Sequence, residues 1–293
     1  MLHSAQMTIG GREFVWGQRT YLMAILNLTP DSFSGDGLIT AKNPVEAAVA
    51  QARAFVAAGA DILDVGGEST RPGAQPVSVD EEMARVLPVI QALRDAVDVP
   101  VSIDTWKSQV AEAALRAGAA LLNDVWGFKA DPQMAQVAAR YGVPVVLMHN
   151  RSSWAQAEVR ERLGGRYVGV PYQNLLAEVQ QELRESVDIA IAAGVRPENI
   201  LLDPGIGFGK TVEQNLELLN RLEEVRTLGY PLLLGASRKS FIGYTLNLPP
   251  EDRTAGTAAA VAVAIVRRAD VVRVHDVSFM AQVCRMTDAI VRR

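Results

Sequence analysis

The sequence predicts an α/β protein, a (β/α)8 TIM barrel with a short N-terminal β-hairpin, in which residues 1–293 form a single domain. Two observations predict this fold. A short apolar segment bounded by turn residues recurs along the chain, and an alanine-rich pattern with helical spacing follows each one. The apolar segments show no polar alternation, which is typical of parallel strands covered by helices on both faces. Eight regular units in 293 residues fit a closed barrel better than an open doubly wound sheet.

The elements follow in a regular order. Residues 1–19 form an extension in which TIGGREFVW (8–16) predicts a hairpin that could plug the N-terminal end of the barrel. The predicted strands lie in YLMAILN (21–27), DILDVGG (61–67), VPVSIDT (99–105), LLNDV (121–125), PVVLMHN (144–150), NILLDPG (199–205), PLLLGAS (231–237) and DVVRVHD (270–276). The predicted helices are 44–60, 79–97, 107–119, 132–142, 172–194, 211–229 and 254–268, with a last one near 279–293. Strands and helices are expected to alternate without a break.

Composition narrows the class of protein. A net charge of −4 and the absence of a basic run argue against a nucleic-acid partner. The single cysteine, Cys284, excludes an intrachain disulfide and a cysteine-based metal site. The N-terminus has no cationic segment followed by a long apolar one, and no stretch reaches the length of a membrane span. We therefore expect a cytoplasmic protein with no membrane partner.

Polar residues stand where the predicted strands end. Catalytic groups of a (β/α)8 barrel lie at these carboxyl ends and in the loops that follow. A buried polar side chain costs about 1–3 kcal/mol unless it is paired, so folding alone does not explain a full ring of them. Helix capping could account for Ser237 or Thr105, but not for three polar residues inside otherwise apolar strands. The polar strand ends are Asn27, Asp64, Glu68, Asp104, Asn123, His149, Asp203, Ser237, Arg273 and His275.

These positions belong to motifs that resemble a known family. The motifs are NLTPDSFS (27–34), DVGGESTRPGA (64–74), SIDTWK (102–107), NDVWG (123–127), LMH (147–149), LDPGIGFGK (202–210), ASRKSFIG (236–243) and RVHD (273–276). Together, in unbroken order from about residue 20 to the end, they resemble the dihydropteroate synthases, pterin-binding barrels inhibited by sulfonamides. The resemblance implies condensation of 6-hydroxymethyl-7,8-dihydropterin diphosphate with 4-aminobenzoate in folate biosynthesis, with Mg²⁺ as cofactor. It also implies a homodimer formed through outer helices.

A pterin presents adjacent N–H and NH₂ donors beside a carbonyl, and a carboxylate can accept from both donors. Asp203 is our choice for this contact, although it could instead cap the following helix. The other candidates are Asn123 and Asp104 for the ring nitrogens, Lys239 for the carbonyl, and Met148 and Phe208 for the ring faces, where both could equally be core residues.

The diphosphate needs cations. Arg273 and His275 are two residues apart on a predicted strand, so they share one face and suit an anion site. Alone, His275 would more often be a core histidine. By resemblance, Asn27 contacts the magnesium ion. An aromatic amine is unprotonated at neutral pH, so we expect SN1-like loss of diphosphate without a general base, with the field of Asp104 and Asp203 stabilising the cation.

The resemblance places 4-aminobenzoate between two mobile loops, 29–38 with Phe33 and 66–75 with Thr70, Arg71 and Pro72. Ser240, near a predicted helix start, is expected to bind the carboxylate. The family usually reads TPDSFSDGG, whereas this chain reads TPDSFSGDG. The aspartate has moved to Asp36, so no loop role is assigned to it.

Other classes of function stay open. A pterin-dependent methyltransferase shares the barrel but should lack the STRPGA and SRKSFIG motifs, and a Schiff-base aldolase would use Lys239. A non-catalytic barrel should have lost some of the polar strand ends. A nucleotide-binding P-loop would rest on LLDPGIGFGKT (201–211), where Pro204 replaces the first glycine and removes an N–H donor. We instead expect Lys210 and Thr211 only to open the next helix, with Thr211 capping it through Gln214.

Overall fold

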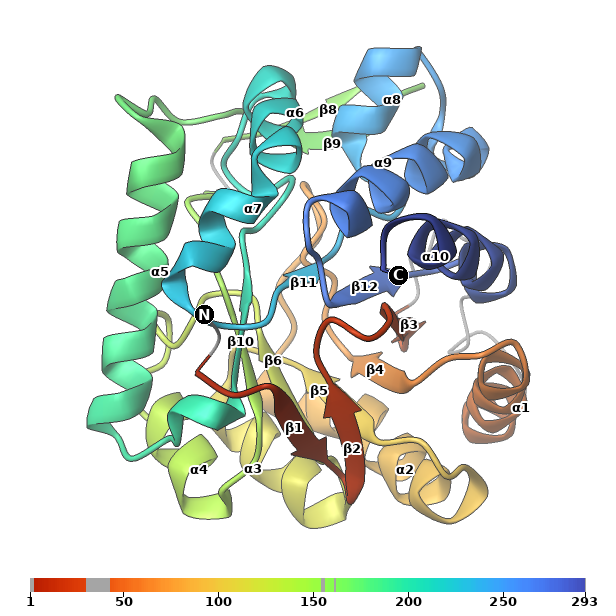
Figure 1. The fold of residues 1–293 in the computed structure, drawn as a ribbon. Helices are drawn as coiled ribbons and strands as arrows, with labels where there is room; N and C mark the ends of the chain where they lie inside the picture. The colour runs from red at the N-terminus through yellow and green to blue at the C-terminus, as the bar shows by residue number, and fades with distance from the viewer. Residues whose placement is uncertain (1–2, 30–42, 154–155, 161, 293) are drawn as a thin grey trace.

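Eight parallel strands form a barrel in the computed structural model, which describes residues 3–29, 43–153, 156–160 and 162–292 (Figure 1). The strands are β3 (Tyr21–Asn27), β4 (Ile62–Gly66), β5 (Val101–Asp104), β6 (Leu121–Asp124), β7 (Val145–Met148), β10 (Ile200–Asp203), β11 (Leu233–Leu234) and β12 (Val271–Val274). Their order is β10-β7-β6-β5-β4-β3-β12-β11, and a parallel bridge between Leu202 and Leu232 joins the two outer strands. The predicted fold class is confirmed.

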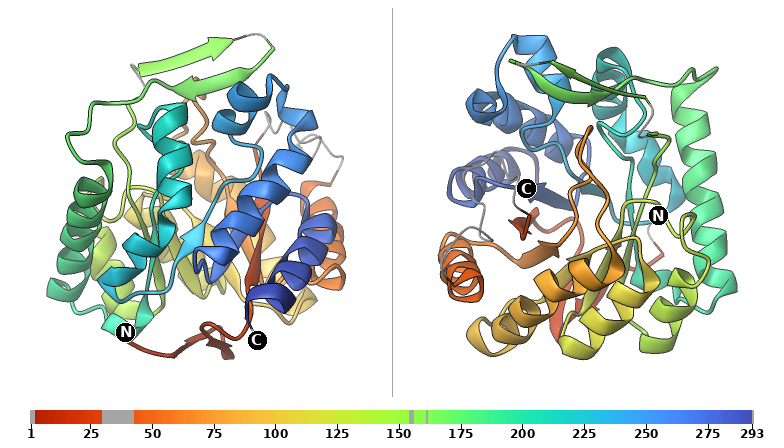
Figure 2. Two further views of the ribbon diagram at one scale, coloured as in Figure 1. Left: turned by 45° about the horizontal axis from the view of Figure 1, so that its top comes forward. Right: turned by 180° about the vertical axis from the view of Figure 1, so that it is seen from behind.

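Helices surround the barrel (Figures 1 and 2). They are α1 (Pro44–Ala57), α2 (Val79–Ala96), α3 (Ser108–Ala117), α4 (Met134–Tyr141), α5 (Leu175–Ala192), α6 (Val212–Asn220), α7 (Leu222–Val225), α8 (Ser240–Leu246), α9 (Thr254–Val266) and α10 (Val277–Val291). The predicted helix 211–229 is divided, because the backbone leaves helical geometry at Arg221, with φ −113° and ψ 22°. The predicted cap of α6 is confirmed as a capping box between Thr211 and Gln214.

The N-terminal hairpin closes one end of the barrel, as the sequence predicts. Strands β1 (Gln6–Ile9) and β2 (Arg12–Val15) pair antiparallel across a Gly10–Gly11 turn with positive φ at both residues. A side chain at Gly10 would bring Cβ within 2.9 Å of Pro100 Cβ, so only glycine fits there. The hairpin buries Met7, Ile9, Phe14 and Trp16 against the inward residues of the barrel, which are Tyr21, Met23, Ile62, Leu121, Val146, Leu201, Leu233 and Val271.

A second hairpin was not predicted and interrupts the regular alternation of strands and helices. Strands β8 (Ala157–Arg160) and β9 (Gly164–Tyr167) pair antiparallel between β7 and α5. The strands are four residues each and mostly exposed or half-buried, so they carry too little apolar alternation to be recognised. Figure 2 shows this hairpin across the C-terminal end of the barrel, opposite the first hairpin. Within the described part of the chain, no helix is long and apolar enough to cross a membrane.

Candidate active site

A cavity opens at the C-terminal end of the barrel, where the sequence predicts the site. The predicted residues that the structure describes all line it: Asn27, Thr70, Arg71, Pro72, Asp104, Asn123, Met148, Asp203, Phe208, Lys239, Ser240, Arg273 and His275. Phe33 and Asp36 lie outside the described residues. Strand ends β3, β5, β6, β7, β10 and β12 and the loops after β4, β10 and β11 therefore bring these side chains together.

Arg273 is held by two carboxylates. Its Nε donates to Asp64 Oδ2 at 2.6 Å, and a terminal nitrogen donates to Asp104 Oδ2 at 2.7 Å. Asp64 Oδ2 also accepts from Asn123 Nδ2 at 3.0 Å, and Asp64 is fully buried. The sequence marked Asp64 as a polar strand end but gave it no role. Because Arg273 is paired with two carboxylates, its positive charge is already compensated. It can therefore attract a diphosphate through directed N–H groups more than through net charge.

Asp203 ends β10 with its two oxygens in different surroundings. Oδ1 accepts from the Gly205 backbone N–H at 2.7 Å, and Oδ2 lies towards Gly235 and the cavity. Burial raises the pKa of Asp203, while nearby Lys239 lowers it. Lys239 donates to the Ile206 carbonyl, and its ammonium lies 4.6 Å from the centre of the Phe208 ring.

His275 does not carry the positive charge that the sequence interpretation gave it. Burial, together with the charges of Arg71 and Arg273, holds the pKa of His275 well below its usual range. Ser237 Oγ accepts from the His275 backbone N–H at 3.2 Å and lies 3.0 Å from Nδ1. Ser237 therefore fixes the orientation of the imidazole ring through Nδ1. His275 can donate one hydrogen bond as a neutral ring.

The glycine-rich turn after β10 is tied together by Lys210. Its buried ammonium donates to the carbonyls of Gly205 (2.9 Å) and Phe208 (3.1 Å) and lies 2.9 Å from His149 Nδ1. Since this ammonium is directed to carbonyls of its own loop, it cannot serve as a P-loop lysine. The prediction that Lys210 only opens the next helix is wrong, because its side chain fixes the turn that carries Phe208.

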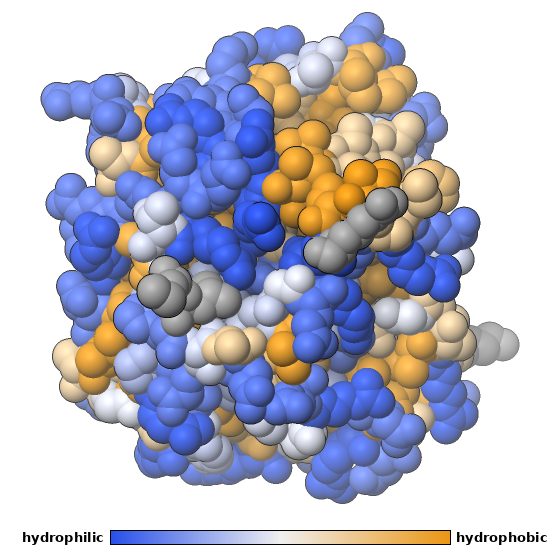
Figure 3. All heavy atoms as spheres, in the orientation of Figure 1, coloured by the Kyte–Doolittle hydropathy of each residue, from blue (hydrophilic) through white to orange (hydrophobic). Residues whose placement is uncertain are grey.

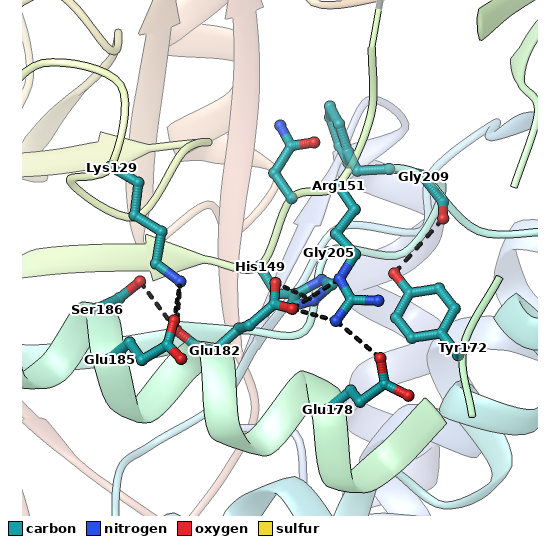
Figure 4. A network of polar contacts seen from close by, with 12 residues as sticks. Lys129, His149, Arg151, Tyr172, Glu178, Glu182, Glu185, Ser186, Gly205 and Gly209 are labelled. Atoms are coloured by element: carbon teal, nitrogen blue, oxygen red, sulfur yellow. Dashed lines mark hydrogen bonds and ion pairs between the residues drawn. The ribbon is translucent and has the colours of Figure 1, made fainter. Parts of the chain in front are cut away.

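A charged network continues outward from His149 (Figure 4). His149 Nε2 lies 3.2 Å from Glu182 Oε2, and Arg151 forms ion pairs with both Glu182 and Glu178. Burial lowers the pKa of His149 to about 4, so the ring is neutral. The polar strand end at His149 therefore supports the loop and does not line the cavity.

The loop after β4 is clamped at its base. Glu68 Oε1 accepts from the Val77 N–H at 3.0 Å, and Glu68 Oε2 accepts from Trp106 Nε1 at 2.7 Å. Lys107 donates to the Val77 carbonyl at 2.9 Å and forms ion pairs with Glu68 and Glu82. The clamp fixes both ends of a loop whose Thr70, Arg71 and Pro72 line the cavity. Glu68 thus positions the loop through the contacts at its base.

Comparison with known proteins decides the family. The pterin binding enzyme family matches residues 23–275. Dihydropteroate synthase of Clostridium beijerinckii is 52% identical over 288 residues, covering 98% of this chain and 100% of that protein. The chain belongs to the dihydropteroate synthase family of pterin-binding enzymes.

Relatives of this synthase family have been solved with ligands. A Clostridium difficile dihydropteroate synthase in the presence of pteroic acid aligns with a TM-score of 0.86 and 46% identity, covering 96% of this chain and 100% of that one. A Xanthomonas albilineans dihydropteroate synthase with 4-aminobenzoic acid aligns with a TM-score of 0.87 and 40% identity, covering 98% of each chain. The resemblance drawn from the eight motifs is confirmed.

The described residues of this synthase fit a magnesium ion only if a bound substrate supplies further oxygen ligands. Among the described residues, no group of three or more His, Cys, Asp or Glu side chains could hold a metal. Asn27 at the end of β3 offers one amide oxygen at the cavity. Mg²⁺ usually keeps several waters and takes few protein oxygens when a phosphate supplies the others. Such a donor set suits an ion that arrives with a diphosphate.

We expect kcat/KM of this synthase to rise as the pH increases through about 7 and to fall above about 8. Burial raises the pKa of Asp104 to about 7, although Arg273 opposes the shift, and burial lowers the pKa of Lys239 to about 8. Below pH 7 Asp104 gains a proton and loses an acceptor, and above pH 8 Lys239 loses its charge. Steady-state rates between about pH 5 and about pH 10 test this profile.

Two variants assign the acidic limb of that profile. Asp104→Asn should abolish it, because the titrating group is gone. Asp124→Asn is the matched control: Asp124 is fully buried on β6, but it does not line the cavity. An acidic limb that survives in Asp104→Asn would remove Asp104 from the assignment.

Proposed function

We propose that this protein joins 6-hydroxymethyl-7,8-dihydropterin diphosphate to 4-aminobenzoate, giving 7,8-dihydropteroate and diphosphate. The observation that carries the proposal is a single cavity that combines acceptors for a pterin edge, at Asp203 and Asp104, with donors for a leaving group, at Arg273 and His275. Its relatives at about half identity are named for this activity. Because the product is 7,8-dihydropteroate, the proposed activity belongs to folate biosynthesis.

The pterin binds in the deeper part of the cavity. Asp203 Oδ2 accepts from the pterin N–H and NH₂ donors, while Gly205 holds the other oxygen in place. Asn123 is fixed by its bond to Asp64, so its amide oxygen is left to face a ring N–H. Lys239 approaches the pterin carbonyl. Met148 and Phe208 lie in an apolar cluster with Val125 and cover the ring faces.

The substitution depends on the leaving group. The C–O bond to diphosphate breaks first, and the electron-rich dihydropterin stabilises the resulting methylene cation. Arg273 and neutral His275 donate hydrogen bonds to the departing diphosphate, and Asp104 and Asp203 supply negative potential near the cation. Magnesium held by Asn27, when bound, supplies the charge that neutralises the diphosphate. The aniline nitrogen then forms the new C–N bond and releases its proton.

4-Aminobenzoate binds last, against the loop after β4. Thr70, Arg71 and Pro72 line this side of the cavity, and the Ser240 hydroxyl lies at the start of α8 beside it. Arg71 and Ser240 then bind the carboxylate.

This order of binding gives a testable coupling. Aminobenzoate alone should bind poorly, and diphosphate should improve its affinity at least about tenfold, because the enclosure of the amine is complete only when the anion site is occupied. Titration calorimetry of aminobenzoate with and without diphosphate and magnesium measures the ratio. Equal affinities would contradict the coupling.

The activity itself is tested by incubating the protein with dihydropterin diphosphate, magnesium and 4-aminobenzoate, and measuring dihydropteroate. Formation of product that requires all three supports the proposal, and no product with a folded protein contradicts it. Borohydride in the presence of a carbonyl substrate is the test of the aldolase alternative, since a Schiff base at Lys239 would be trapped as a covalent adduct.

The proposal includes a cytoplasmic homodimer. Large apolar side chains are exposed on two helices that pack against each other, α9 and α10: Val263, Val266, Phe279, Met286 and Ile290. Figure 3 shows apolar side chains gathered over α8 and α9. A patch of this kind is typical of a subunit interface.

Light scattering after gel filtration should therefore give twice the mass of the chain. Met286→Glu should shift the mass to that of a monomer, because it buries a charge in the interface. Arg285→Glu, which introduces the same residue on the polar face of α10, is the matched control. A monomeric wild-type protein would contradict the homodimer.

A further inference from the structure

The β8–β9 hairpin forms part of the cavity wall, although the sequence gave no role to residues 151–171. Gly164, Gly165 and Tyr167 line the cavity together with the predicted site residues. Figure 2 shows the hairpin lying across the mouth of the barrel. The hairpin is thus in contact with the space in which both substrates must meet.

Tyr167 links two loops of the site through one side chain. Its ring stacks on that of Phe208, with centroids 6.1 Å apart and an angle of 30° between the planes. Its hydroxyl donates to the Thr70 carbonyl at 2.9 Å. Tyr167 is only 5% exposed, so water does not replace this bond readily. The loop after β4 is therefore tied to the turn after β10.

The hairpin is held on both sides, which makes Tyr167 a fixed anchor. On one side Gly165 touches the loop after β4 so closely that a Cβ would lie 2.6 Å from the Pro72 carbonyl oxygen. On the other side Arg253 donates to the Leu163 carbonyl at 2.7 Å. The guanidinium of Arg166 lies 4.4 Å from the centre of the Tyr244 ring on α8.

We propose that Tyr167 is a positioning residue for the second substrate, a planar aromatic amine. It holds Thr70 and Pro72 at a set distance from the Phe208 ring, so that the loop is ready to enclose the amine beside the bound pterin. The inference rests on the proposed function for the identity of the amine. The Tyr167 hydroxyl takes no part in the pterin contacts at Asp203, Asn123 and Phe208, so the two substrates should respond differently to loss of the hydroxyl.

The test compares three variants in the full-length protein. Tyr167→Phe removes the hydroxyl and keeps the ring, and Tyr167→Leu removes both. Tyr141→Phe is the matched control. Tyr141 lies on α4 away from the cavity, and its hydroxyl accepts from Arg116 Nε at 2.9 Å. For each protein we measure KM for 4-aminobenzoate, kcat, pterin affinity by calorimetry, and hydrogen exchange of the amides of residues 69–77.

Loss of one buried hydrogen bond should raise KM for 4-aminobenzoate about five- to tenfold in Tyr167→Phe, and more in Tyr167→Leu. In Tyr167→Phe, which keeps the ring stacked on Phe208, pterin affinity and kcat should stay within about twofold, while the amides of residues 69–77 exchange faster. Tyr141→Phe should change none of these quantities.

Unchanged KM and unchanged exchange in Tyr167→Phe would overturn the proposal. Equal losses in pterin affinity and aminobenzoate affinity, with exchange faster throughout the chain, would also overturn it, because they indicate a general structural role. A folded wild-type protein that forms no dihydropteroate would contradict the proposed function instead. In that case the exchange at residues 69–77 still decides whether Tyr167 anchors the loop.

Discussion

Replacement of Arg273 by alanine is expected to lower kcat/KM at least about a hundredfold, which corresponds to about 3 kcal/mol of transition-state stabilisation. The guanidinium donates to a diphosphate whose charge increases as the C–O bond breaks, so its contribution is larger in the transition state than in the ground state. Single-turnover rates with dihydropterin diphosphate and saturating 4-aminobenzoate measure this loss.

The same change should also weaken pterin binding. Arg273 is the partner of Asp64 and Asp104, so its removal leaves two neighbouring buried carboxylates without a countercharge. Arg273 opposes the rise in the pKa of Asp104 that burial causes, so without it Asp104 gains a proton more readily and loses acceptor strength towards the pterin ring. We expect the affinity for a diphosphate-free pterin to fall about tenfold, which calorimetry would show.

Arg226→Ala separates this effect from loss of stability. Arg226 pairs with fully buried Asp270, and its side chain is 20% exposed, as is that of Arg273. Both variants should be destabilised by about 3–5 kcal/mol through an uncompensated buried carboxylate. Only Arg273→Ala should lose turnover per folded molecule. Equal turnover in the two variants would remove Arg273 from the mechanism.

The barrel and most of the cavity could be predicted because both depend on local patterns. Each apolar segment ends in a polar residue, and the fold itself carries every such end to one rim. Asp104, Asn123 and Asp203 were identified as exceptions inside apolar strands, and all three line the cavity. For these residues the spacing along the chain determines the position in space.

What escaped prediction depends on contacts between distant segments. The pairing of Arg273 with Asp64 joins residues 209 apart, and no local pattern indicates that it will offset the charge of the arginine. The neutral state of His275 follows from burial and from neighbouring cations, which periodicity does not report. Tyr167 lies in a short strand without apolar alternation, and its role appears only when Thr70 and Phe208 are seen beside it.

Asp203→Asn should weaken pterin binding by about 2–4 kcal/mol, tens to hundreds of fold, while keeping the shape of the side chain. Asp203 Oδ1 accepts from the Gly205 N–H at 2.7 Å, and Oδ2 is left for the pterin. An amide has one oxygen and one NH₂ group. If its oxygen stays with Gly205, the NH₂ group faces the donors of the pterin. If the amide turns, the NH₂ group faces the Gly205 N–H. In either orientation a donor therefore faces another donor.

Asp124→Asn is the matched control for this loss. Asp124 is fully buried and accepts from the Trp126 and Phe128 backbone N–H groups at 2.8 Å, but it does not line the cavity. It should lose stability and keep its pterin affinity.

Calorimetry with a pterin and with ATP also separates the pterin site from a nucleotide site in the same turn. Lys210→Met removes an ammonium that holds the carbonyls of Gly205 and Phe208, so it should lower the melting temperature and weaken pterin binding less than Asp203→Asn does. A phosphate-binding lysine would give the reverse order, because it would contact the ligand directly while Asp203 would not. ATP binding that Lys210→Met abolishes, together with pterin binding indifferent to Asp203→Asn, would overturn the assignment of Asp203.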